Sequence, residues 1–228
     1  MLDLIWQVID FTLHIDRHLP AIIVAYGAVT YLILFLIVFC ETGLVVTPFL
    51  PGDSLLFATG AFCVAHSDIP GGHLQVAVVI PLLIVAAVVG DAVNYSIGRR
   101  LAPRFGEGKT VRFIKTEHLE RTQRFYEKHG GRTIILARFI PIIRTFAPFV
   151  AGIGKMQYRR FATYNVVGAV VWVCSFVLLG YFFGSLPIIK KNFSYVILAI
   201  LVLSVLPVVI EFIKARRESK VQPAGGAS

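Results

Sequence analysis

Long apolar stretches alternate with short polar segments along this chain. A transmembrane helix needs about 20 mostly apolar residues to cross roughly 30 Å of hydrocarbon. Four stretches meet this requirement, two without any charge and two with a single acidic residue, Asp91 or Glu211. The pattern predicts about four transmembrane helices, over Leu19–Cys40, Leu74–Gly98, Phe161–Leu186 and Phe193–Ile213.

Two further apolar stretches, 42–65 and 134–154, are interrupted by proline, glycine and charge. The interrupting residues are Pro48, Pro51, Gly52, Asp53 and Gly60 in the first stretch, and Arg138, Pro141, Arg144, Pro148 and Gly152 in the second. Proline removes a backbone donor and clashes with the preceding turn, so neither stretch forms one straight helix. Irregular backbone at membrane depth persists only where protein or a wet cavity surrounds it. We therefore expect two re-entrant, broken-helix hairpins whose breaks line a pathway.

The first 18 residues have a different pattern. Their polar positions recur every three or four residues, with apolar residues between them, at Asp3, Gln7, Asp10, His14 and Arg17. This spacing predicts an amphipathic helix lying on the membrane surface. Together these segments predict an all-α polytopic protein, with one membrane domain over 19–213 and a basic tail over 214–228.

Composition supports the membrane assignment. Hydrophobic residues make up 57% of the 228 residues and charged residues 15%, against about 45–50% and about 25% in soluble domains. The cysteines, Cys40, Cys63 and Cys174, lie in apolar runs without C-x-x-C spacing. This excludes a zinc finger and a thioredoxin-type site, and we expect neither a metal nor a cofactor.

The net charge of +9 arises mainly in three segments. Segment 99–132 holds ten Lys and Arg against four Glu, and further basic residues lie in 155–160 and 214–228. By the positive-inside rule all three are cytoplasmic, with both termini on that side and the hairpins entering from opposite faces. Lys190 and Lys191 are the exception. Binding of anionic headgroups by the basic loop is a second interpretation, and nucleic acid is not an expected partner.

The two interrupted stretches resemble each other. The first reads F-L-P-G-D-S from Phe49 and the second F-I-P-I-I-R-T from Phe139, and a small residue and glycine follow in each. Weak internal similarity with inverted topology is typical of secondary transporters, whose half-helices meet at a midplane substrate site. Generic proline and glycine turns are the alternative explanation.

Five charged residues fall within otherwise apolar sequence: Glu41, Asp53, Asp91, Arg138 and Arg144. Such residues are expensive in a bilayer and usually mark pathways, proton relays or paired charges. Arginine suits phosphate because its planar fork donates two parallel hydrogen bonds. In the functional interpretation the arginines hold an anionic group and the carboxylates carry protons. In the structural interpretation, ion pairs only lock the hairpins together.

Two more patterns each permit two interpretations. Asp91, Asn94, Tyr95 and Gly98 share one helix face, which indicates hydrogen bonding between helices or lining of a pathway. The G-x-x-x-G from Gly180 permits either a homo-oligomer or close packing within the chain.

The motifs at 41–43, 47–57, 90–99 and 138–152 resemble the DedA family of membrane proteins. The resemblance covers roughly residues 1–217. It implies an inner-membrane protein with two opposed re-entrant hairpins that moves lipids across the bilayer, undecaprenyl phosphate in some members, and depends on the proton-motive force. It also implies that Glu41 and Asp53 are the functional acids and that Arg138 and Arg144 are the functional arginines.

The leading hypothesis is therefore a lipid translocase, either a flippase or a scramblase, for a polyprenyl phosphate or a phospholipid. We do not expect an enzyme, because all six histidines lie outside the spans and hairpins and no H-E-x-x-H or G-x-S-x-G occurs. Two competing hypotheses are a non-transporting membrane assembly factor and a proton-coupled exporter of small molecules.

Overall fold

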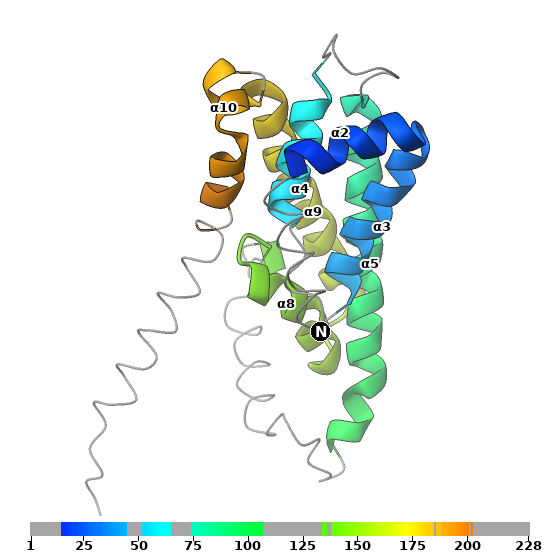
Figure 1. The fold of residues 1–228 in the computed structure, drawn as a ribbon. Coiled ribbons are helices and arrows are strands. Elements are labelled where there is room, and N and C mark those ends of the chain that lie inside the picture. The colour runs from blue at the N-terminus through cyan, green and yellow to red at the C-terminus, as the bar shows by residue number, and fades with distance from the viewer. Residues whose placement is uncertain are drawn as a thin grey trace, which may run out of the picture.

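A computed structural model describes residues 15–44, 52–64, 74–106, 134–135, 138–184, 186–200 and 202. Within these ranges every regular element is an α-helix (Figure 1). Several predictions lie outside them: most of the surface helix over 1–18, the breaks at Pro48 and Pro51, the greater part of the basic segment 99–132, the end of the fourth span and the tail.

Two long helices form the frame of the molecule. Helix α5 (Val76–Gly106) and helix α9 (Tyr158–Phe183) confirm two of the predicted apolar spans, since Val76–Ala102 and Tyr158–Phe183 are long and apolar enough to cross a membrane. The two helices are antiparallel, because Asn165 of α9 lies against the carbonyl of Val88 while Phe161 stacks on Tyr95.

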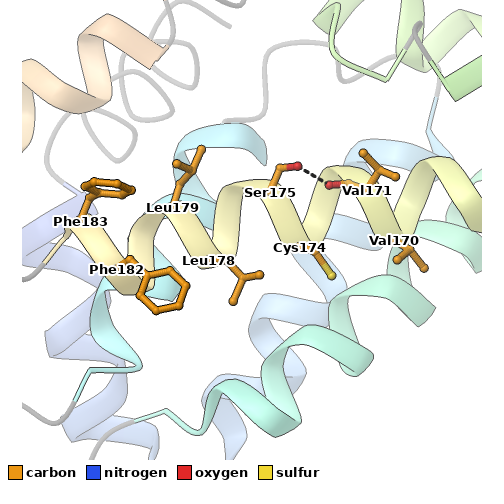
Figure 2. Close-up of a pocket in the computed structure, with 8 residues that line it drawn as sticks. All are labelled: Val170, Val171, Cys174, Ser175, Leu178, Leu179, Phe182 and Phe183. Carbon is orange, nitrogen blue, oxygen red and sulfur yellow. Dashed lines mark hydrogen bonds between the residues drawn. The ribbon is translucent and has the colours of Figure 1, made fainter.

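The outward faces of both long helices are apolar. Along α5 the exposed positions repeat every four residues over most of its length, and along α9 they form a continuous face that includes a shallow groove (Figure 2). The groove is lined by Val170, Val171, Cys174, Ser175, Leu178, Leu179, Phe182 and Phe183. Exposed apolar surface on this scale is typical of contact with lipid.

The predicted single span over Leu19–Cys40 is wrong, because two helices occupy it. Helix α2 (Ile15–Tyr26) and helix α3 (Val29–Gly43) meet at Gly27, whose φ of +52° lies in the left-handed region that glycine adopts without strain. Helix α2 crosses the end of the bundle at which α5 begins (Figure 1). Helix α3 then descends only to the middle of α5, where the backbone of Gly43 meets that of Gly90.

Two half-length helices fill the centre. Helix α4 (Gly52–Phe62) follows the first proline-rich break, and helix α8 (Pro141–Ile153) follows the second. Proline is well tolerated at the start of α8, because the first N–H groups of a helix have no partner within the helix. Pro148 is buried inside α8, and the predicted helix break at this residue is wrong because α8 continues through it to Ile153.

Glycines let each half-length helix pack closely on a long one. A Cβ on Gly60 or Gly180 would strike backbone atoms across the α4–α9 contact, and a Cβ on Gly98 or Gly152 would strike backbone across the α8–α5 contact. Gly184 meets Ala61 in the same way, so the G-x-x-x-G motif serves packing within the chain. Each half-length helix runs parallel to its long helix, and the two pairs are arranged alike.

Helix α10 (Pro187–Lys191) follows α9, and the chain is again helical over 193–200. Phe193 tilts against Phe57 and Phe62 of α4, with ring centroids 6.0 and 6.3 Å apart. The start of the predicted fourth span therefore packs on α4.

Candidate functional site

The five predicted intramembrane charges come together in the middle of the bundle. Asp91 lies halfway along α5, and all five side chains are buried, with exposed fractions from 1% for Glu41 to 7% for Arg144. They form two groups, Arg144 with Glu41 and Asp53, and Arg138 with Asp91, and both arginines lie close to the ring of Trp172.

Arg144 joins the two broken segments of the chain. It lies in the first turn of α8, and its Nη1 donates to Oδ1 of Asp53 in the first turn of α4 at 2.5 Å. Its Nη2 donates to Oε1 of Glu41, near the end of α3. One guanidinium in α8 therefore joins the end of α3 and the start of α4, although Glu41 and Asp53 lie 103 and 91 residues away from it in the sequence.

Gly52 brings the Glu41 carboxylate to the N-terminus of α4. Its backbone N–H donates to Oε1 of Glu41 at 3.1 Å, and the helix dipole favours negative charge at this end. The absence of a Cβ creates the space, because a Cβ on Gly52 would overlap both carboxylate oxygens. The sequence predicts Gly52 as a helix break, and the structure adds this contact to that role.

We expect Gly52→Ala to displace Glu41 from both Arg144 and the α4 N-terminus. The backbone of α4 cannot retreat easily because Gly60 packs on the backbone of α9. Overpacking of a buried site typically destabilises by about 1–3 kcal/mol. Thermal unfolding of the purified protein in detergent measures this loss. Gly154→Ala is the control, since its Cβ would meet only carbonyls of its own helix at 3.3 Å or more. Equal stability of the two variants would contradict the assignment.

The second group is centred on Arg138. Its Nη2 donates to Oδ2 of Asp91 and, at 2.5 Å, to Oδ1 of Asn165. The amide nitrogen of Asn165 donates in turn to the carbonyl of Val88, and Gly168 leaves space for the arginine side chain. The helix-face pattern predicts Asp91 as part of a supporting polar face. The structure also makes it a direct partner of an arginine.

The remaining members of that predicted face connect backbone segments. The amide nitrogen of Asn94 donates to the carbonyl of Thr42 at 3.1 Å and to that of Thr145 at 2.8 Å, which joins α3, α5 and α8. Tyr95 donates from its hydroxyl to the carbonyl of Met156 and accepts from Arg99 at 3.0 Å. These contacts favour hydrogen bonding between segments as the role of this face.

Trp172 is the central residue that sequence reasoning did not find. Its Nε1–H donates to Oδ1 of Asp53 at 2.8 Å, and its ring lies 5.0 Å from the guanidinium carbon of Arg144 and 5.8 Å from that of Arg138. One signal was present in the sequence. Tryptophan in a membrane helix favours the lipid–water interface, whereas this one lies in the middle of an apolar run.

The charged centre has an unbalanced charge and polar atoms without hydrogen-bond partners. Counted as ionised, three carboxylates and two guanidiniums leave one negative charge in excess. Among the described residues, Oε2 of Glu41 and the Nε atoms of both arginines have no hydrogen-bond partner. No group of three potential metal ligands occurs in the part of the chain that the structure describes. The arrangement can therefore accept a proton or exchange a carboxylate for another anion.

Comparisons with known proteins agree on one family. A family model described as the VTT domain matches residues 50–182. Protein DedA of Escherichia coli (strain K12) is 53% identical over 216 residues, which are 95% of this chain and 97% of that protein. An uncharacterized membrane protein of Mycobacterium tuberculosis (strain ATCC 25618 / H37Rv) is 40% identical over 190 residues, 83% and 82% of the two chains. Inner membrane protein YqjA of Escherichia coli (strain K12) is 34% identical over 165 residues, 71% and 70% of the two chains. No solved structure matches.

Proposed function

Because this chain belongs to the DedA family of VTT-domain membrane proteins, we propose that it is a lipid translocase of the bacterial inner membrane. Its substrate is undecaprenyl phosphate or another anionic phospholipid, which it moves between the leaflets. The proton-motive force biases the direction of movement. The names of its relatives, which include an inner membrane protein, support the location.

The proposed topology has two re-entrant hairpins between the long spans. Helices α3 and α4 form the first hairpin and open toward the end of the bundle where α5 begins. The segment before α8 and α8 itself form the second, which opens toward the other end. Gly43, at the end of α3, contacts the middle of α5, which supports a first hairpin that reaches halfway across the bundle. The cytoplasmic face is then the one that carries the basic segment 99–132.

The observation that carries the proposal is the bridge from Arg144 to Glu41 and Asp53. Two carboxylates accept the hydrogen bonds of a buried guanidinium. A phosphate can accept hydrogen bonds from the same guanidinium in the same forked geometry. Glu41 also lies at the N-terminus of α4, a position that suits phosphate as well as carboxylate. A lipid phosphate that replaces these carboxylates therefore finds its donors already in place.

Protons complete the exchange. A carboxylate released from Arg144 in a dry site is stabilised when it takes up a proton. Uptake at Glu41 or Asp53 from the periplasmic side therefore frees Arg144 for phosphate, and release to the cytoplasm restores the ion pairs. Arg138, whose guanidinium lies against the same indole ring, provides a second guanidinium close to the exchanging group.

The lipid chains stay outside the bundle throughout. The outward faces of α5 and α9 are apolar over most of their length, including the groove on α9 (Figure 2). Only the headgroup needs to enter the charged centre. A charged centre inside the bundle with apolar faces outside suits a lipid better than a small cation, because a small cation gains nothing from two buried arginines.

Reconstitution of the pure protein in liposomes tests the proposal. Labelled undecaprenyl phosphate is followed between leaflets with and without a pH gradient, beside undecaprenol, which lacks the phosphate. We expect movement of the phosphate that the gradient accelerates, and no accelerated movement of the alcohol. Movement of the phosphate that ignores the gradient would contradict proton coupling and indicate a scramblase. If neither this lipid nor phosphatidylglycerol moves, the translocase proposal is wrong and a non-transporting assembly factor becomes the better hypothesis.

A further inference from the structure

We propose that Trp172 is a positioning residue of the charged centre. Its indole N–H holds Asp53 against Arg144, and its ring face keeps Arg144 in place while the anion bound to that guanidinium is exchanged. The proposal deepens the translocase function and rests on it for its transport consequences. Its geometric part can be tested without any substrate.

The indole N–H and Arg144 meet at one oxygen atom. Nε1 of Trp172 and Nη1 of Arg144 both donate to Oδ1 of Asp53, at 2.8 and 2.5 Å. The donors come from α9 and α8, and the acceptor lies in the first turn of α4. When Arg144 turns to another anion, the tryptophan donor remains on Asp53. The carboxylate then stays in position to recapture the arginine.

The face of the Trp172 ring attracts the two arginines and not the carboxylates. A cation over the face of tryptophan is attracted by the ring quadrupole, most strongly where water is excluded. The guanidinium carbon of Arg144 lies 5.0 Å from the ring centroid and that of Arg138 lies 5.8 Å away. Trp172 is completely buried, so no water competes for this contact. This attraction does not depend on which anion the arginines hold.

The fold gives the indole little freedom to move. Residues of α9 around Trp172 pack closely on their neighbours, with Gly168 against Arg138 on one side and Gly180 against the backbone of α4 on the other. Asn165, one turn further away, is bonded both to Arg138 and to the carbonyl of Val88. The position of the ring is therefore determined by the packing of α9 on α4 and on Arg138, and not by the bridge from Arg144 to Glu41 and Asp53.

The emission of Trp172 provides the first test. The chain has two tryptophans, Trp6 and Trp172, so W6F makes Trp172 the sole reporter. Indole emission responds to charges and hydrogen bonds around the ring. In vesicles of phosphatidylcholine alone, we expect D53N and R144K each to shift the emission of the W6F protein. S175A is the control, because Ser175 donates to the carbonyl of Val171 on the outer face of the same helix (Figure 2). Unchanged emission in D53N and R144K would overturn the proposal.

Transport provides the second test. W172F retains an aromatic ring without the N–H donor, and W172L removes both. We expect W172F to insert, to unfold somewhat more easily because a buried carboxylate loses a hydrogen bond, and to move undecaprenyl phosphate roughly tenfold more slowly. W172L should be slower again. Y195L removes an aromatic ring from an exposed position after α10, outside the groove, and should leave the rate unchanged.

The two tests separate the two proposals. If the natural protein moves no lipid but D53N and R144K shift the emission of Trp172, the positioning role holds and the translocase function fails. If W172F transports at the natural rate, the positioning role is wrong even though the translocase function stands. If W172F does not fold, the emission test still decides the geometric part of the proposal.

Discussion

Replacing Arg144 by alanine should reduce lipid translocation to the rate of protein-free liposomes. The variant removes the guanidinium that bridges Glu41 and Asp53 and leaves both carboxylates buried without it. Breaking a buried ion pair from one side destabilises by about 3–5 kcal/mol. The loss of transport can therefore accompany a loss of folded protein, and insertion must be measured beside the rate.

Arg144→Lys separates these effects. Lysine keeps the positive charge but offers a single ammonium in place of the planar fork, so it cannot hold one anion through two parallel bonds. We expect this variant to fold and insert but to transport at least about tenfold more slowly, because one charge-assisted hydrogen bond is lost. Arg160→Gln, at an exposed arginine near the start of α9, should transport normally. Natural rates in Arg144→Lys would contradict the role of the fork.

Gly180→Val should prevent α4 from packing on α9. A Cβ at this position would strike the carbonyl oxygen of Phe57 in α4, and neither backbone can move without separating the helices. Overpacking of a core costs about 1–3 kcal/mol where side chains can adjust. Here the obstacle is backbone, so we expect a loss in the free energy of unfolding of about 3 kcal/mol or more. Thermal unfolding in detergent, followed by size-exclusion chromatography, measures it.

Two further variants identify the cause. Gly98→Val should have a similar effect, because its Cβ would strike the carbonyl oxygen of Phe149 in the equivalent α8–α5 contact. Leu179→Val, beside Gly180 on the exposed face of α9, should unfold at the natural temperature within a few degrees. If Gly180→Val stays folded as a monomer but loses a dimer, the motif serves an oligomer instead.

The residues of the charged centre could be found from sequence, because charge inside an apolar run is conspicuous. Their partners could not. Glu41 and Arg144 are 103 residues apart, and nothing in the local sequence indicates whether Arg138 or Arg144 meets a particular acid. Asp91 shares a helix face with Asn94 and Tyr95, yet its partner is an arginine from another segment. Tertiary packing alone decides these pairs.

The broken segments illustrate the same limit in the fold. Proline marks the breaks before α4 and α8, but the bend at Gly27 carries no such mark, because glycine is common inside membrane helices. An uninterrupted apolar run therefore predicts one span where the chain forms two helices. The unusual position of Trp172 in the middle of an apolar run is visible in the sequence, but the charged residues that its indole contacts are not, because they come from other segments.

In the proposed cycle, Arg144 exchanges its carboxylates for a lipid phosphate. Solid-state NMR measures this directly in protein labelled with ¹⁵N-arginine, in bilayers of galactolipid whose only phosphorus belongs to added undecaprenyl phosphate. We predict dephasing of guanidinium ¹⁵N by ³¹P in the natural protein, and a loss of part of that signal in Arg144→Lys. Dephasing that is absent from the natural protein, or equal in the two proteins, would contradict the account.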